Sequence, residues 1–134
     1  MIHVDTSFLV DLLRESARGL RGAATAALDD IEGEAVRVGV HVVCELLAGA
    51  ERSQRPSLER QRVARLCSSL EVVYPDEQFP KVYARILASL QRSGRQIATM
   101  DLLIATAALV DEAALVTRNV RDFRRVPGLE IRGY

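Results

Sequence analysis

Residues 2–13, IHVDTSFLVDLL, decide the fold of this chain. Residues 2–5 form a short, mostly apolar run that ends in an aspartate, which is typical of a strand. Apolar side chains then recur at helical spacing, which predicts a helix that runs to about Arg14. Thr6 or Ser7 can cap the start of this helix. A strand that leads directly into an amphipathic helix is the opening of an α/β fold.

The same alternation continues along the rest of the chain. Alternating or β-branched segments predict further strands at residues 35–40, 71–74, 114–117 and 129–132. Apolar periodicity predicts helices at residues 19–32, 41–50, 57–69, 78–93 and 99–111, and a helical turn at 118–125. We therefore expect one three-layer α/β/α domain with a parallel central sheet, spanning residues 1–134. In such sheets, ligands bind beyond the carboxyl ends of the strands.

The composition argues against several classes of protein. A length of 134 residues with 49% hydrophobic residues suits one domain with its own core. No stretch reaches the ~20 apolar residues of a membrane span, and no secretory signal is visible. The two cysteines fit neither a zinc motif nor a disulfide framework, so we expect a cytoplasmic protein with buried, reduced thiols. No glycine-rich phosphate loop supports a phosphatase or a similar α/β enzyme.

The charge balance gives no hint of nucleic acid, since 18 basic residues match 18 acidic ones. The type of basic residue is more informative, because every Lys or Arg position except Lys81 is an arginine. Arginine suits bidentate contacts with phosphate. A GC-rich genome, whose codons favour Arg and Ala, is the first explanation for this bias.

Three carboxylates stand where an ordinary core would exclude them. Asp5 ends the first predicted strand, Glu45 lies in the run VVCELLAG, and Asp101 opens the apolar helix LLIATAALV. Carboxylates are almost never fully buried unless they are paired or bind a metal. Each of the three follows, or closely follows, a strand end or a loop, so they can converge at one edge of the sheet.

Converging carboxylates suit phosphodiester hydrolysis with Mg²⁺ or Mn²⁺, which prefer oxygen ligands. Such a metal lowers the pKa of a bound water and offsets the negative charge that grows on the phosphate. Each acid taken singly has a plainer alternative. Asp5 can cap the first helix, Asp101 can complement a helix dipole, and Glu45 can lie on a solvated helix face. Taken together, their order and spacing favour a functional site.

Four segments resemble, in order, the motifs of the PIN-domain family, and most closely those of VapC-type toxins. They are IHVDTSFLVDLL at residues 2–13, HVVCELLAGAERS at 41–53, IATMDLLIATAAL at 97–109 and LVTRNVRDF at 115–123. Each motif alone is weakly specific. All four in this order, in a chain of this length, are a strong signal, and the similarity extends over the whole chain.

The resemblance assigns roles to these acids. Asp5, Glu45 and Asp101 match the acids that bind metal in the family. The fourth acidic position falls at Asn119, which keeps a carbonyl ligand and loses a charge, so a second metal would bind more weakly. Asp122 can supply the missing carboxylate from the same helical turn, or it can face outward between two arginines.

Other residues near the motifs are candidates for supporting roles. Thr6 and Thr117 match positions where the family places hydroxyls near the metal, although Thr6 can equally be a helix cap. His41 lies four residues before Glu45 on the same helix face, and we expect it to cap that helix rather than to bind metal. Four arginines flank the motifs and are candidates for RNA phosphate contacts, although solvated salt-bridging faces explain them equally well. These are Arg14, Arg52, Arg118 and Arg121.

The resemblance implies a Mg²⁺- or Mn²⁺-dependent endoribonuclease that acts as the toxin of a toxin–antitoxin pair. It also implies a homodimer and a cognate antitoxin that covers the acidic site. The apolar faces of the first helices and of residues 57–69 can serve those contacts, or can be core. Two alternatives stay open. A housekeeping PIN nuclease would lack an antitoxin gene alongside, and a catalytically weakened repressor partner would show an empty metal site on titration.

Overall fold

A five-stranded parallel sheet forms the centre of the computed structural model, which describes residues 1–134. The strands are ordered β3-β2-β1-β4-β5. Their bounds are Ile2–Val4 for β1, Val36–Gly39 for β2, Glu71–Val73 for β3, Ala114–Thr117 for β4 and Ile131–Gly133 for β5. All four strand pairs are parallel, which confirms the predicted α/β fold.

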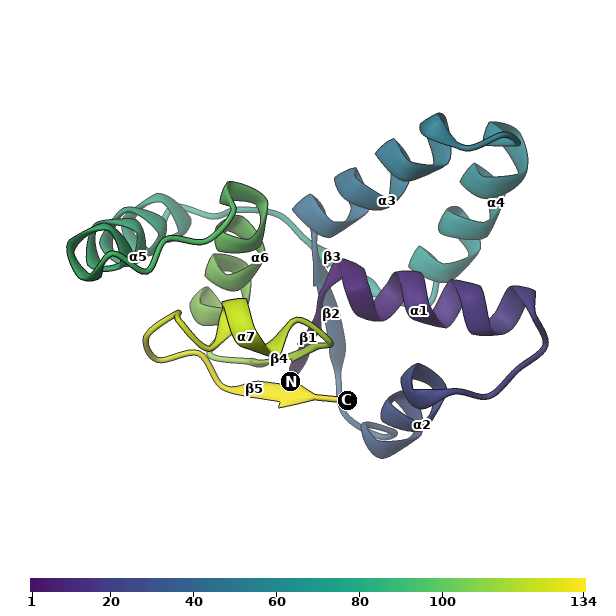
Figure 1. Cartoon of the computed structure of the whole chain (residues 1–134), viewed down its shortest axis with the longest axis horizontal. Helices are drawn as coiled ribbons and strands as arrows, with labels where there is room; N and C mark the ends of the chain where they lie inside the picture. Colours follow the sequence, from purple (N-terminus) through teal and green to yellow (C-terminus); the bar gives the residue numbers. More distant parts are fainter.

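Seven helices cover the two faces of this sheet. Their bounds are Thr6–Ala17 for α1, Ala23–Asp30 for α2, Val40–Arg52 for α3, Pro56–Cys67 for α4, Phe79–Ser93 for α5, Thr99–Val110 for α6 and Val120–Phe123 for α7. The helices α1 to α4 lie on one side of the sheet, and α5 to α7 lie on the other (Figure 1). None of the seven combines the length and the apolar character that a membrane crossing requires.

The strand order reverses at β1, which lies between β2 and β4. Ile2 is in register with Val36 on one side and with Ala114 on the other. Because the strands are parallel, the residues that follow β1 and β4 emerge at the same edge of the sheet. The backbone N–H of Asp5 still bonds to Val116 of β4 at 3.3 Å. In doubly wound sheets, this reversal point is where a ligand site is expected.

The core lies on both faces of the central strands, because helices cover both. It joins residues of β1, β2 and β4 to the inner faces of α1, α3 and α6. The largest fully buried apolar side chains are Phe8, Phe123, Ile2, Leu9, Leu90, Leu102 and Leu115. This packing fixes the first turns of α1 and α6 above the same edge of the sheet.

The second helix begins later than its apolar pattern predicts. The helix α2 starts at Ala23, and Leu20 is 60% exposed instead of facing the core. Gly19 has a φ of +62°, which lets the chain turn after α1. The Glu15 carboxylate then accepts hydrogen bonds of 2.6–3.1 Å from the Thr25 hydroxyl and from the N–H groups of Gly22, Ala24 and Thr25. These bonds, led by that of the Thr25 hydroxyl, lower the pKa of Glu15 to about 2.

The prediction that His41 caps the third helix is wrong. Helix α3 begins at Val40, and Gly39 is its N-cap. The His41 ring stacks on Phe79 instead, with 5.4 Å between the ring centroids, and its Nδ1 is buried without a hydrogen-bond partner. Burial lowers the pKa of His41. Both cysteines are free as expected, but neither is buried, since Cys44 is exposed and Cys67 is only half-buried.

Candidate active site

Asp5 lies at the carboxyl end of β1 and is only 3% exposed. It is the N-cap of α1 and accepts a hydrogen bond of 2.9 Å from the backbone N–H of Phe8. The Ser7 hydroxyl lies 2.8 and 2.9 Å from its two oxygens, and the Thr117 hydroxyl donates to Oδ2 at 2.5 Å. Burial raises the pKa of Asp5, and these hydrogen bonds oppose the rise. The helix-cap alternative for Asp5 is therefore correct, and it does not prevent a second role in a site.

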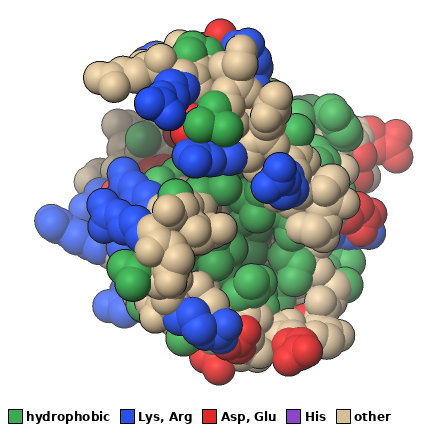
Figure 2. Space-filling model, turned by 90° about the vertical axis from the view of Figure 1, so that its right-hand side faces the viewer, with side chains coloured by type: hydrophobic (Ala, Val, Ile, Leu, Met, Phe, Trp, Pro, Cys, Tyr) green, Lys and Arg blue, Asp and Glu red, His purple; other side chains and the backbone are tan.

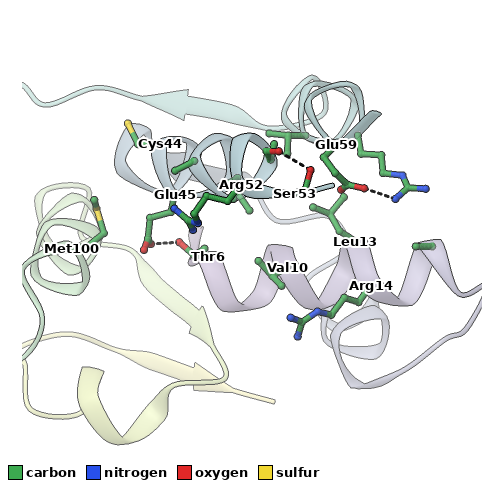
Figure 3. A pocket seen from close by; sticks show the side chains of 17 residues that line it. Thr6, Val10, Leu13, Arg14, Cys44, Glu45, Arg52, Ser53, Glu59 and Met100 are labelled. Carbon is green, nitrogen blue, oxygen red and sulfur yellow. Dashed lines mark hydrogen bonds and ion pairs between the residues drawn. The ribbon is translucent and has the colours of Figure 1, made fainter. Parts of the chain in front are cut away.

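Glu45 projects from the second turn of α3 toward the start of α1. The Thr6 hydroxyl donates a hydrogen bond of 2.5 Å to its Oε1 (Figure 3). Thr6 is the first residue of α1 and follows the capping Asp5, so the helix-cap alternative for Thr6 is wrong. The bond sets Glu45 next to the residue that follows Asp5. Glu45 is therefore not on a freely solvated face.

Asp101 lies in the first turn of α6 and is half-buried. Burial raises its pKa to about 6, and the negative charges of Glu45, Asp122 and Asp5 add to the rise. Each of these three carboxylates is therefore close enough to repel the Asp101 carboxylate. The sheet and its helices thus place four acids around one edge of the sheet, one directly after β1 and the others on α3, α6 and α7.

Asp122 lies near these acids, because its charge contributes to the raised pKa of Asp101, and it is half-buried rather than fully exposed. It lies on the short helix α7, and its Oδ2 accepts a hydrogen bond of 3.2 Å from the side-chain amide of Asn119. The backbone N–H of Asn119 bonds to the Thr117 hydroxyl at 2.9 Å. Asn119 thus holds Asp122, and Thr117 links this turn to Asp5. We refer to Asp5, Glu45, Asp101 and Asp122 as the acidic cluster.

The acidic cluster offers only carboxylate oxygens, the donors that Mg²⁺ and Mn²⁺ prefer. A divalent cation among these acids would offset both the burial and the repulsion that together raise the pKa of Asp101. No three His, Cys, Asp or Glu side chains lie close enough together to surround one ion. A Mg²⁺ ion usually keeps several waters and binds through one or two carboxylates, so the donor set fits such a metal.

A family model described as PIN domain matches residues 2–129. The chain belongs to the PIN-domain family. The matched range extends from the first residue of β1 to just before β5, so it contains the whole acidic cluster and all four sequence motifs.

Curated relatives of this PIN domain carry VapC names. Ribonuclease VapC1 of Haemophilus influenzae is 36% identical over 86 residues, which are 64% of this chain and 64% of the relative. The chain thus spans less than two thirds of the length of that relative. Ribonuclease VapC19 of Mycobacterium tuberculosis is 33% identical over 128 residues, which are 95% of each protein.

Solved structures share the fold of the PIN domain along its whole length. VapBC2 from Rickettsia felis, bound to a DNA fragment from its promoter, has a TM-score of 0.90 at 24% identity and covers 100% of this chain and 99% of that chain. DNA-bound VapBC from Salmonella typhimurium has a TM-score of 0.88 at 26% identity and covers 98% and 96%. These similarities confirm the PIN-like α/β architecture.

Two of the four predicted RNA-binding arginines line a groove of the PIN domain between α1, α3 and α4. The groove has a volume of about 870 Å³, and Glu45 and Met100 belong to its lining. Arg14 projects from α1 and Arg52 from the end of α3 (Figure 3). Arg52 lies two helical turns after Glu45, on the same face of α3.

The other two arginines follow β4. Arg118 lies beside the acidic cluster, because its positive charge lowers the pKa of Asp5. Its Nη1 donates hydrogen bonds of 2.9 and 3.1 Å to the two carboxylate oxygens of Asp11. Arg121 is exposed on α7 and forms no ion pair within the chain. The salt-bridge alternative therefore applies to Arg118 but not to Arg121.

The sequence patterns predicted no role in the site for Ser7, Asp11 or Tyr134. Ser7 bonds to Asp5, and Tyr134 donates a hydrogen bond of 2.8 Å to Asp11. Ser7 is part of the first motif, so its proximity to Asp5 could have been inferred. Nothing in the local sequence indicates that Tyr134 reaches α1, because 123 positions separate it from Asp11.

Proposed function

We propose that this chain is a Mg²⁺- or Mn²⁺-dependent endoribonuclease that cleaves RNA phosphodiester bonds as the toxin of a toxin–antitoxin pair. The observation that carries this proposal is that carboxylates from four segments lie around the reversal point of a parallel sheet. Hydrogen bonds from Thr117, Thr6 and Asn119 hold three of them, which are Asp5, Glu45 and Asp122. Uncompensated acids repel one another, and a divalent cation offsets that cost. The ribonuclease names of the VapC relatives support the same activity.

Within this proposal, Asp5, Glu45 and Asp101 bind the hydrated metal, some of them through its waters, since no three acids surround one point. Asp122 supplies a carboxylate in place of the family's fourth acid, which is Asn119 in this chain. When bound, such a metal lowers the pKa of a water and offsets charge on the phosphate. The chain's own hydroxyls support the acids. Thr117 and Ser7 orient Asp5, and Thr6 orients Glu45.

The RNA contacts in this proposal come from the arginines around the acidic cluster. Arg14 and Arg52 line the groove that starts at Glu45, so they can meet phosphates on that side of the cluster. Arg118 and Arg121 follow β4 and can meet phosphates on the opposite side. The four arginines offset the negative charge of the acidic cluster, so that RNA, which is a polyanion, can approach it.

A second groove continues the first along α1. It lies between α1, α2 and α4, has a volume of about 730 Å³, and shares Leu13, Ala17 and Arg62 with the first groove. We call the two grooves together the apolar trough. Hydrophobic side chains gather in a hollow of this face, with Lys and Arg side chains mainly above and to the left of it and Asp and Glu side chains to the right and below (Figure 2). Leu20 and Leu28 are 60% and 41% exposed there.

The trough suits the antitoxin of the proposed pair. An amphipathic segment with acidic residues at its flanks would bury the exposed leucines and face Arg21, Arg62 and Arg65. Because the trough ends at Glu45, a partner that fills it would also cover the acidic cluster. The VapBC structures with the same fold support the presence of such a partner.

We also propose that the chain is a cytoplasmic homodimer, as the family resemblance implies. Two free cysteines, one of them exposed, suit a reducing compartment. Sedimentation of the purified chain at micromolar concentration tests the dimer. A single species with the mass of one chain would contradict it.

The experiment that tests the activity is cleavage of a mixed RNA pool by the purified chain with Mg²⁺, with Mn²⁺ or with a chelator. Asp101→Asn is the informative variant, because Asp5 also caps α1 and its replacement would destabilise the fold. Asp30→Asn, at an exposed acid that ends α2, is the control.

We expect metal-dependent cleavage by the wild type and by Asp30→Asn, and almost none by Asp101→Asn. Cleavage that persists in the chelator, or that Asp101→Asn leaves undiminished, contradicts the proposed mechanism. The ends of the products would reveal the RNA sequence or shape that the enzyme selects.

A further inference from the structure

A chain of hydrogen bonds links Arg118 to two residues outside the acidic cluster. Nη1 of Arg118 donates to both carboxylate oxygens of Asp11, at 2.9 and 3.1 Å. The Tyr134 hydroxyl donates to Oδ2 of the same carboxylate at 2.8 Å. Asp11 therefore receives a donor from the residue after β4 and another from the residue after β5.

The geometry of α1 ties this chain to the acidic cluster. Ser7 and Asp11 lie one helical turn apart on the same face of α1. The Ser7 hydroxyl donates to Asp5 and accepts the backbone N–H of Arg118 at 3.2 Å. Both the backbone and the side chain of Arg118 are thus fixed to the helix that Asp5 caps.

Packing against Phe8 fixes the position of Tyr134. Its ring meets the fully buried Phe8 ring edge-on, with 5.3 Å between the centroids and 83° between the planes. This contact directs the Tyr134 hydroxyl toward Asp11. The resulting hydrogen bond restricts rotation of the Asp11 carboxylate toward other donors.

The bonds to Asp11 leave most of the Arg118 guanidinium available. Both bonds use Nη1, so Nη2 and Nε keep their donors. The side chain is 56% exposed, whereas that of Asp11 is 14% exposed. The positive charge of Arg118 still reaches Asp5. A directed, solvent-facing cation therefore lies at the rim of the acidic cluster.

Stability alone does not explain this arrangement, because the Arg118 guanidinium is largely exposed and an ion pair with a solvated partner contributes little to stability. A free arginine at this place would be drawn to the carboxylates of the acidic cluster and would compete with a metal for them. The Asp11 carboxylate gives the guanidinium a partner outside the cluster. It thereby keeps Arg118 close to the site without neutralising the acids.

We propose that Asp11 and Tyr134 are positioning residues that hold Arg118 so that Nη2 and Nε bind a phosphate of the RNA beside the one that is cleaved. This proposal rests on the proposed function, because it takes RNA as the ligand. Arg118 makes the contact, and Asp11 and Tyr134 act through it.

The test measures RNA binding apart from cleavage. The dissociation constant of a single-stranded RNA is measured with a chelator present, over about 50–200 mM salt, for wild type, Arg118→Ala, Asp11→Asn, Tyr134→Phe and the double variant Asp11→Asn/Arg118→Ala. Tyr134→Phe keeps the ring on Phe8 and removes only the hydroxyl. Asp29→Asn, which breaks the exposed Arg21–Asp29 pair, is the matched control.

We expect Arg118→Ala to weaken binding about tenfold and to lower the slope of log Kd against log salt by about 1, as for one lost phosphate contact. Asp11→Asn should reproduce most of this loss, and Tyr134→Phe a smaller part. The double variant should be no worse than Arg118→Ala, because both of its substitutions remove the same contact. Asp29→Asn should bind like the wild type.

Wild-type binding by Asp11→Asn, losses that add in the double variant, or no RNA binding by the wild type would each overturn the proposal. Cleavage of the same RNA with Mg²⁺ separates this result from the proposed function. A chain that binds RNA as expected but does not cut it keeps the positioning role and loses the nuclease.

Discussion

The Thr6 hydroxyl lies 2.5 Å from Oε1 of Glu45 and joins the first residue of α1 to the second turn of α3. Thr6 directly follows Asp5, which caps the same helix. Thr6 therefore fixes the position of Glu45 relative to Asp5, although 40 positions separate these two acids in the sequence. Thr6 and Glu45 both line the groove between α1 and α3, which also contains Arg14 and Arg52, two of the arginines proposed to meet RNA phosphates.

Replacing Thr6 with valine should weaken the metal site. Valine keeps the shape of the side chain and removes the hydrogen bond that orients Glu45. Loss of such an outer partner typically costs about 10–100-fold in metal affinity or activity. We expect the Mg²⁺ concentration for half-maximal RNA cleavage to rise by roughly tenfold. Thr6→Ser, which restores the hydroxyl, should return it to the wild-type range, and failure of this rescue would speak against an orienting role.

The raised pKa of Asp101 predicts a pH-dependent cost in stability. The folded chain binds this proton with a pKa of about 6, against a value of 3.8 for the ordinary group. Because the native state holds the proton more tightly, the free energy of unfolding falls as pH rises from about 4 to about 6. Asp101→Asn removes this cost, so it should stabilise the metal-free chain by roughly 1–3 kcal/mol at about pH 7.5.

Urea denaturation with a chelator measures this effect. The gain of Asp101→Asn over the wild type should nearly vanish at about pH 3.5, where the Asp101 carboxyl is protonated in both states. It should also shrink when Mg²⁺ is added, because the wild type then gains the metal's binding energy. A gain of the same size at both pH values would show that the charge of Asp101 is not its cause.

Glu15 should make the opposite contribution to stability. Its pKa of about 2, against the ordinary 4.5, shows that the folded chain favours the charged form. This stability is fully present above about pH 4.5 and is lost as pH falls toward about 2. Glu15→Gln should therefore lower the melting temperature at neutral pH, since the start of α2 loses its charged cap.

Thermal denaturation followed by circular dichroism checks this prediction. The deficit of Glu15→Gln should narrow as pH falls toward about 2. Glu32→Gln, at an exposed glutamate without a hydrogen bond, should melt like the wild type at each pH. Equal effects of the two substitutions would rule out a specific cap.

The apolar trough yields a prediction about the antitoxin. Leu28 is 41% exposed within the trough, and Leu47 is 40% exposed outside its lining. Burying a leucine is worth about 1.5–3 kcal/mol, so Leu28→Glu should weaken antitoxin binding by roughly tenfold or more. Leu47→Glu should have little effect. Calorimetry with the cognate antitoxin measures both, and equal losses would place the partner elsewhere.

Much of the site follows from local patterns. Asp5, Glu45 and Asp101 each interrupt an apolar run, and burial of a lone carboxylate is costly enough to indicate a function. Parallel strands end at one edge of their sheet, so the order of strands and helices already predicts that these acids meet. The apolar periodicity of residues 99–111 likewise marks a buried helix that brings Asp101 to that edge.

The sequence by itself determined the order of the elements, the parallel sheet and three of the four acids, because period and propensity act over a few neighbouring residues. Only the tertiary structure decided that Asp122 lies near Asp101, that Glu15 caps the start of α2, and that Tyr134 reaches Asp11. These contacts depend on how distant elements pack, and 107 positions separate Asp11 from Arg118. No local pattern carries that information. Such a contact forms only after the sheet has brought α1 and the ends of β4 and β5 together.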